Sequence, residues 1–213
     1  MSDNKTQQES HLDRQTGTIR GARAAVPQLS ATECPIEAMY EEHFNQRQLC
    51  ADMEMLSAAT RPRPELARRI LVNLCRDLPA HFDDEENSLF PRLRVRALPE
   101  DELGKTLSRL AREHEIAQSA FVLLIPALVC MADGALPAPE DRDALYRLAA
   151  AERRHLIVEN AILLPLARSR LTAEDKRALM AEMCARRDHL PAMDSACARA
   201  LARVAPAIPG GRT

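Results

Sequence analysis

The most informative segment of the sequence is His-Phe-Asp-Asp-Glu-Glu-Asn-Ser-Leu-Phe-Pro, residues 81–91. It returns in altered form as His-Leu-Ile-Val-Glu-Asn-Ala-Ile-Leu-Leu-Pro, residues 155–165. In each copy a Glu follows the His by four residues and a Pro follows it by ten. This spacing places an imidazole and a carboxylate one turn apart on one face of a helix, where both can reach one metal ion. One copy alone would fit an ordinary polar pair near a helix end, but the repetition favours a metal site.

The composition favours an all-α protein. Gly occurs only six times in 213 residues, and Ala, Leu, Arg and Glu dominate the composition. A chain of this length suits one domain with tails and can bury a substantial core. We expect a disordered polar tail over residues 1–33, a helical domain over 34–204 and a flexible tail over 205–213.

Charge and apolar patterning exclude several classes of partner. The net charge is −2 and no basic block occurs, which argues against nucleic acid and anionic membranes. The N-terminus has no apolar core of a secretory signal. The longest apolar run, residues 120–132, has thirteen residues, whereas a membrane span needs about 20. This run favours a buried helix or half of a homodimer interface.

The cysteines show no metal-ligand spacing such as Cys-x-x-Cys. Their scattering predicts mostly buried, reduced thiols in a cytoplasmic protein. The six are Cys34, Cys50, Cys75, Cys130, Cys184 and Cys197.

Hydrophobic periodicity predicts four long helices and a fifth. The four cover about residues 35–59, 65–94, 100–131 and 140–168, and the fifth runs from Thr172, its N-cap, to about Val204. Prolines predict kinks at Pro79 and Pro126 and a disturbed last turn at Pro91.

Four histidines lie on the inward faces of four different helices. Short connections make consecutive helices antiparallel neighbours in an up-down-up-down bundle. Residues equally far from a shared turn then lie at one height. By this count His43, His81, His114 and His155 agree to within three residues, about 4.5 Å along a helix axis.

Four imidazoles and two carboxylates in an apolar interior predict a bound metal, because unpaired buried polar groups are costly. One zinc ion needs only about four ligands. Six ligands suit two metal ions bridged by Glu85 and Glu159, and this ligand chemistry suits iron. Gln118 and Glu152 also face inward and are candidates for orienting ligands or hydrogen-bonding a bound diatomic molecule. The alternatives are ordinary helix-face polarity for these two residues and a metal-free structural bundle for the whole chain.

On these residues the chain resembles the hemerythrin-like, or HHE cation-binding, family. The most specific pieces are the two His-x-x-x-Glu units followed by Leu-Phe-Pro (89–91) or Leu-Leu-Pro (163–165), with His43 and His114 upstream. The resemblance covers about residues 34–190. It implies a four-helix bundle, here with an additional C-terminal helix, around two non-haem iron ions with an oxo or hydroxo bridge.

One departure from the family matters for function. Oxygen-carrying hemerythrins have a second His at the position of Gln118, and an Asp ligand where this chain has Glu159. The four-His, two-Glu set is similar to bacterial di-iron proteins linked to nitric oxide stress and iron-centre repair. We therefore expect a protein that binds or senses O2 or NO rather than a turnover enzyme. Nitric oxide detoxification and iron donation to damaged iron–sulfur centres are the alternatives.

Overall fold

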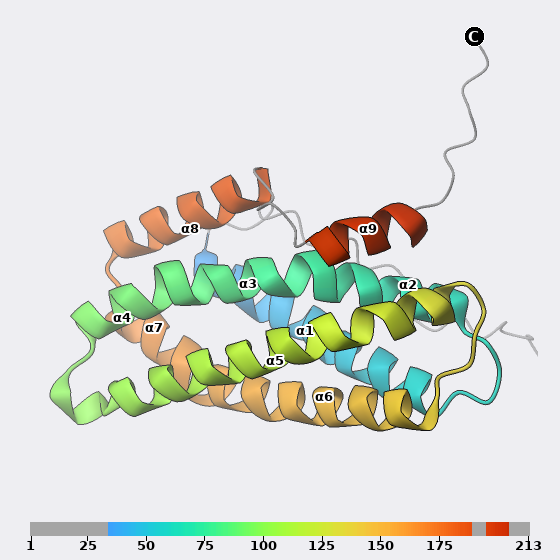
Figure 1. Cartoon of the computed structure of the whole chain (residues 1–213). Coiled ribbons are helices and arrows are strands. Elements are labelled where there is room, and N and C mark those ends of the chain that lie inside the picture. Colours follow the sequence, from blue (N-terminus) through green and yellow to red (C-terminus); the bar gives the residue numbers. More distant parts are fainter. Residues whose placement is uncertain (1–33, 189–194, 205–213) are drawn as a thin grey trace, which may run out of the picture.

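The computed structural model describes residues 34–188 and 195–204, and the regular elements in these ranges are all helical. Four rods form an up-down-up-down bundle (Figure 1). They are α1 (Pro35–Ser57); α2 (Pro64–Val72), α3 (Leu78–Asp84) and α4 (Phe90–Arg96) in series; α5 (Leu103–Ala132); and α6 (Pro139–Val158) followed by α7 (Leu164–Arg170). The all-α bundle predicted from the sequence is confirmed.

Prolines mark the starts of three rods, and tight turns join them. The helices α1, α2 and α6 each begin at a Pro, whose missing N–H would have no partner in a first turn. A 3-10 segment, η4 (Pro99–Asp101), leads into α5. At the α5–α6 turn Gly134 has φ 102°, a left-handed conformation that glycine adopts without strain.

Two of the rods are interrupted by five-residue π-helical segments, namely η2 (Asn73–Asp77), η3 (Glu85–Leu89) and η5 (Glu159–Leu163). Each segment ends two residues before a proline, which is Pro79, Pro91 or Pro165. Proline lacks the N–H of the α-helical ladder and its ring clashes with the carbonyl four residues earlier, so a wider turn relieves the conflict. Pro126 instead lies inside α5 without a π segment, and nothing in the structure explains this difference.

The hydrophobic core forms two clusters at opposite ends of the bundle. One gathers around α2, the second half of α1 and the second half of α5, and the other around α4, α7 and the start of α5. Four histidines and several carboxylates are buried without belonging to either cluster. The polar layer between the clusters is the candidate site.

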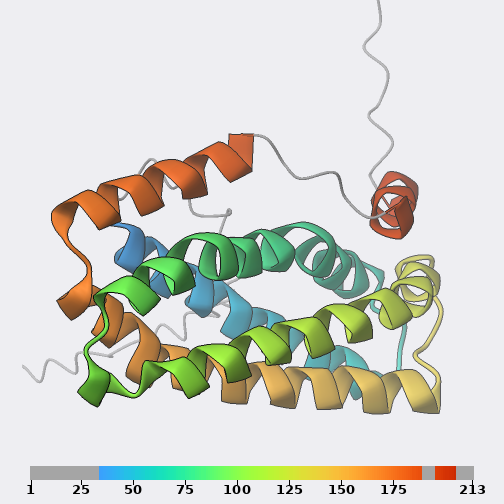
Figure 2. The same ribbon diagram turned by 60° about the vertical axis from the view of Figure 1, so that its left-hand side comes forward.

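Two helices lie in the range predicted for the fifth helix. They are α8 (Ala173–Asp188) and α9 (Ser195–Val204), and residues 189–194 lie outside the described residues. The helix α8 packs on α1 and α3, and α9 packs on α5 and α2, outside the four rods (Figure 2). The predicted tails, 1–33 and 205–213, lie outside the described residues, as do His11 and His189.

The prediction that the cysteines are reduced is wrong for two of them. Cys75 in η2 and Cys197 in α9 form a disulfide across a sequence separation of 122. Partners so far apart leave no local spacing pattern, so this bond could not be predicted from cysteine spacing. Among the free cysteines, Cys50 is buried and Cys130 is exposed.

The helix α5 is unusually apolar. Among the described helices it is the one long and apolar enough to cross a membrane, judged by length and composition. The core helix of a soluble bundle passes the same test, and α5 packs against both α2 and α6.

Candidate metal centre

Two of the three π-helical segments begin at the two predicted carboxylate ligands. Glu85 is the first residue of η3 and Glu159 is the first residue of η5. Both side chains are completely buried. Single π turns within α-helices are frequent at functional sites, because they change which side chains face inward. Here the proline six residues after each Glu accounts for the turn.

All six predicted ligand residues lie together in one buried layer. His43, His81, Glu85 and Glu159 offer ligand atoms that lie within 4.8 Å of one another. A second group with the same property consists of Glu85, His114, His155 and Glu159. The two groups share both carboxylates and divide the histidines into two pairs, an assignment that helix spacing alone left open.

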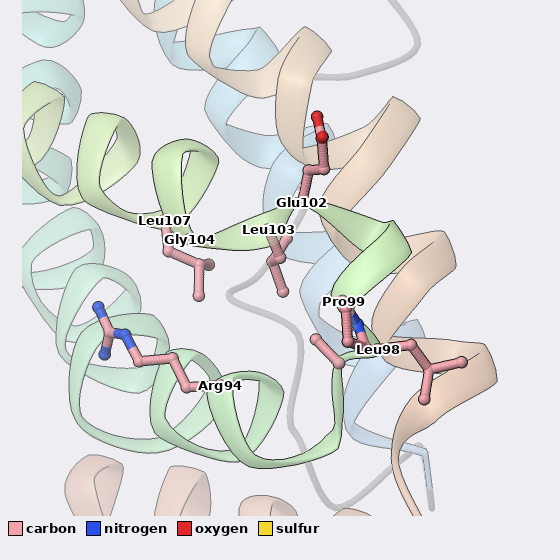
Figure 3. A pocket seen from close by; sticks show the side chains of 8 residues that line it. Arg94, Leu98, Pro99, Glu102, Leu103, Gly104 and Leu107 are labelled. Carbon is pink, nitrogen blue, oxygen red and sulfur yellow. The ribbon is translucent and has the colours of Figure 1, made fainter.

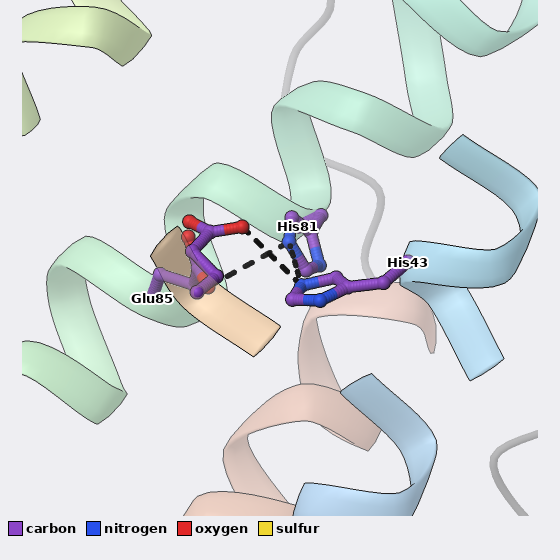
Figure 4. Close-up of side chains that lie close together, drawn as sticks. His43, His81 and Glu85 are labelled. Carbon is purple, nitrogen blue, oxygen red and sulfur yellow. Dashed lines mark hydrogen bonds and ion pairs between the residues drawn. The ribbon is translucent and has the colours of Figure 1, made fainter. Parts of the chain in front are cut away.

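The histidines meet through their Nε2 atoms. In the first pair the Nε2 atoms of His43 and His81 are 3.2 Å apart, and Figure 4 shows the two rings converging beside Glu85. In the second pair the Nε2 atoms of His114 and His155 are 2.9 Å apart. The carboxylates approach the same atoms, and the closest contact is 2.7 Å from His155 Nε2 to Glu159 Oε1. Nε2 is therefore the nitrogen that each ring presents to the centre.

The carboxylate oxygens are short of hydrogen bonds. All four oxygens of Glu85 and Glu159 are buried, and each lies 2.7–3.7 Å from a histidine Nε2, but none has a hydrogen bond within the described part of the chain. Leaving such groups unsatisfied in an apolar interior is costly. A cation between the imidazoles would satisfy them, and imidazole with carboxylate is a donor set that suits iron. The residues present therefore fit a bound metal pair.

The outward nitrogens of three histidines contact carboxylates that the sequence prediction missed. A carboxylate that accepts the Nδ1–H fixes the ring orientation and leaves the Nε2 lone pair free for a metal. The pairs are His81 with Glu42 at 2.8 Å, His114 with Glu86 at 2.7 Å and His155 with Glu113 at 2.9 Å.

The fourth histidine has an amide partner instead. His43 Nδ1 lies 3.3 Å from Asn160 Oδ1. Asn160 follows Glu159 in the sequence as Glu86 follows Glu85, so the two residues hold equivalent positions in the two repeats. Each of the four residues that contact an outward Nδ1 atom directly precedes or follows a predicted ligand in the sequence. This adjacency is the sequence signal that could have identified them.

The charges of the layer are strongly coupled in the metal-free protein. Burial and the neighbouring Glu159 raise the pKa of Glu85, whereas His155 and His114 overcome burial and hold the pKa of Glu159 well below its usual range. Burial lowers the pKa of His43 to about 4. Burial would also lower the pKa of His81, but Glu85 and Glu42 raise it to about 9. A metal ion must displace the proton of such an imidazole, so binding weakens in acid.

Aromatic rings support the second histidine pair. The ring of Phe82 stacks on His114 with centroids 3.9 Å apart and an interplanar angle of 14°. Phe90 also lies nearly parallel to His114, at 6.1 Å. Because both rings are themselves fully buried, they restrict the orientation of the imidazole.

The two further candidates differ in their placement. Glu152 is 3% exposed and its Oε2 has no hydrogen-bond partner among the described residues, so its predicted inward position is confirmed. Gln118 is exposed on α5, and its predicted inward position is wrong. The buried stripe of α5 runs through His114, Ala117 and Phe121, and Gln118 lies to one side of it.

A surface pocket lies away from this layer, at the α4–α5 turn (Figure 3). Its lining includes Arg94, Leu98, Pro99 and Glu102, and none of the six predicted ligands belongs to it. Glu102 has φ 45°, an uncommon left-handed conformation for a residue with a Cβ atom. The pocket gathers no set of metal-binding side chains.

Comparison with known protein families identifies the bundle. Residues 34–167, more than half of the chain, match the family model described as the hemerythrin HHE cation binding domain. No curated protein and no solved structure matched. The helices α8 and α9 lie beyond the matched residues.

Proposed function

This chain belongs to the hemerythrin family of HHE cation-binding domains, and we propose that it holds two non-haem iron ions and binds O2 or NO at them. The observation that carries the proposal is the pair of overlapping ligand groups that share Glu85 and Glu159. One ion in each group would have two imidazoles and both carboxylates as ligands. Imidazole and carboxylate sets with open positions suit iron.

The residues of the layer have distinct tasks in this proposal. Bound ferrous iron would supply electrons and an open position for a diatomic molecule. Glu85 and Glu159 would bridge the ions, while the four Nε2 atoms complete the protein ligands. The outer carboxylates hold three of the rings in the tautomer that leaves Nε2 free.

The burial of the layer supports a diatomic ligand. The six ligand side chains are between 0% and 3% exposed, so a large or highly charged substrate has no direct access. Small, weakly polar molecules such as O2 and NO can pass through the brief openings of a packed core. Glu152, buried three residues before His155 on α6, would provide a hydrogen-bonding group for the bound molecule, and burial raises its pKa to about 7.

The same burial favours retained over donated iron. Iron donation and nitric oxide detoxification remain the alternative roles from the family resemblance. Repeated turnover of NO, or transfer of iron to an apo iron–sulfur protein, would distinguish them from simple binding.

Iron content and the visible spectrum test the proposal. We expect two iron ions per chain, one for each group, and an oxo-bridged absorption when the anaerobic ferrous protein meets air. His81→Ala should lose both signals, whereas His11→Ala, outside the described residues, should keep them. A titration with NO then tests ligand binding. Protein produced with ample iron that contains none would contradict the proposal.

A further inference from the structure

The helix α8 reaches the metal layer from outside the family domain. It begins at Ala173, beyond the matched residues 34–167. From its last turn Arg187 Nη2 donates to Glu42 Oε1 at 2.5 Å, and Arg187 Nη1 lies 2.6 Å from Asp84 Oδ2. A helix beyond the residues matched to the family therefore contacts Glu42, the carboxylate that orients the predicted ligand His81.

A second arginine fixes α8 at the same place. Arg186 Nη1 donates to Asp84 Oδ1 at 2.5 Å, and Arg186 Nε lies 2.6 Å from Asp83 Oδ2. Arg186 also donates to the hydroxyl of Ser88. Asp84 is completely buried and directly precedes Glu85. Removing either arginine would leave a buried carboxylate short of its partners, so the position of α8 is tied closely to α3 and η3.

The contacts continue to the centre through one carboxylate. Glu42 Oε1 accepts a hydrogen bond from Arg187, and Glu42 Oε2 lies 2.8 Å from His81 Nδ1. His81 Nε2 then faces His43 and Glu85 in the first ligand group. A single carboxylate therefore separates α8 from a ligand ring.

The other repeat contains the same chemistry without α8. There Glu113 holds His155 Nδ1, and Arg109 Nε donates to Glu113 Oε1 at 2.7 Å. Arg109 and Glu113 are four residues apart on α5, and their side chains are 56% and 32% exposed. The side chains of Arg187 and Glu42 are only 21% and 15% exposed. Water screens the first pair more than the second, so the arginine has more influence where it comes from α8.

We propose that α8 is a positioning element for the metal centre, and that Arg187 controls through Glu42 how strongly His81 donates to its metal ion. This inference rests on the proposed di-iron function. A carboxylate that accepts the Nδ1–H makes the imidazole a stronger donor, and an arginine sharing that carboxylate weakens the effect. Docked α8 thus favours the ferrous state of the ion bound by His43 and His81. Displaced α8 favours the ferric state.

The coupling must operate in both directions, because binding free energies at linked sites are reciprocal. If α8 docking alters the centre, iron binding alters the docking of α8. Hydrogen exchange can detect this at the amides of residues 173–188, without any measurement of activity. Whatever draws α8 from the bundle would then adjust the affinity and redox state of the centre.

The main experiment is a redox titration of iron-loaded variants. Arg187→Gln should shift the midpoint potential to more negative values, because the centre loses a cation and gains a stronger donor. The matched variant Arg109→Gln should give a smaller shift. In a Glu42→Gln background, Arg187→Gln should have little further effect, since coupled residues are non-additive. Equal shifts for the two arginines, or a full shift retained in the Glu42→Gln background, would overturn the inference.

A structural control separates positioning from loosening of the fold. Arg92 also anchors α8, through Glu182 Oε1 at 2.6 Å, but makes no contact with Glu42. We expect Arg92→Gln and Arg187→Gln to lower the melting temperature, and only Arg187→Gln to move the potential. Arg187→Lys, which keeps the charge, should shift the potential less than Arg187→Gln does.

The two levels of proposal can fail separately. Iron-free protein under ample iron supply contradicts the di-iron function itself. Normal iron loading with an unchanged potential in Arg187→Gln contradicts only the role of α8. In hydrogen exchange, ferrous iron should protect the amides of residues 173–188 in the unmodified chain but not in Arg187→Gln. Equal protection in both proteins would also contradict the role of α8.

Discussion

Contacts between single side chains offset the cost of burying the polar layer. Each carboxylate in the layer faces imidazoles, and each outward ring nitrogen has a carboxylate or an amide against it. Glu152, which is not one of the six predicted ligands, likewise has one oxygen without a hydrogen-bond partner among the described residues. A neutral carboxylic acid is less costly to bury than a carboxylate, so Glu152 responds to pH in a predictable direction.

In the metal-free protein, we predict that Glu152→Gln reduces the fall in the free energy of unfolding between pH 5 and pH 8. Burial raises the pKa of Glu152 from its ordinary value of 4.5 to about 7. The folded state therefore binds more protons than the unfolded state between these values, and stability falls as pH rises through them. The contribution amounts to roughly 3 kcal/mol at pH 8. Urea unfolding at pH 5 and pH 8 checks this: a fall as steep in the variant as in the unmodified chain would contradict it.

The sequence predicts a residue's position well where helical periodicity determines it. It predicts less where the position depends on side-chain contacts between different helices. His43, His81, His114 and His155 come together because equal distances from short turns give equal heights. Gln118 was misplaced because the buried stripe of α5 is narrower than four-residue spacing suggests. The outer carboxylates depend on which side chains of neighbouring rods meet, and helical periodicity does not contain that information.

At the level of helices, the prolines were recognised but their effect was not. The sequence predicted a kink at Pro79 and a disturbed last turn at Pro91, whereas both of these prolines, and Pro165 as well, follow a π segment. A π turn keeps the rod continuous and rotates the residues on its two sides relative to each other. Scales of local helix propensity do not include the π-helical turn. A sequence-based prediction therefore expects a kink at a proline within a helix.

The π turns should therefore trade helix stability for ligand placement. We predict that Pro165→Ala lowers iron affinity by roughly tenfold, because a relaxed α-helical turn moves Glu159 relative to α7. The metal-free variant should be at least as stable as the unmodified chain, since Pro is exposed here and disfavoured in helices. Iron titration and thermal melting measure the two effects.

Pro126 provides the matched control. It is exposed inside α5 and follows no π segment. Pro126→Ala should raise stability by up to roughly 3 kcal/mol and leave iron affinity unchanged. If Pro165→Ala binds iron as tightly as Pro126→Ala does, the π turn has no part in positioning Glu159.

At the scale of the whole molecule, the disulfide connects the last described helix to the rod that contains His81. The bond between Cys75 and Cys197 spans 122 residues, so breaking it should lower the free energy of unfolding by roughly 2–5 kcal/mol. Cys197→Ser tests this by urea unfolding, with Cys130→Ser, an exposed free thiol, as the control that should change little.

Thiol counting gives an independent check. The denatured, unreduced protein should show four free thiols, and reduction should raise the number to six. Six thiols without reduction would contradict the bond. The cytoplasmic location predicted from reduced thiols loses its supporting argument if the bond forms in the cell, because disulfides persist mainly in oxidising compartments.

The amide of Asn160 has a consequence for the electronic structure of the centre. His114 and His155 are each backed by a carboxylate, whereas His43 is backed by Asn160 and only His81 by a carboxylate. The proposed irons are therefore inequivalent, and the one held by His114 and His155 has the richer donors. Removing one electron should leave a trapped mixed-valence pair with the ferric charge on that iron. Mössbauer spectra should then resolve two distinct iron sites, and Asn160→Asp should bring their parameters closer together.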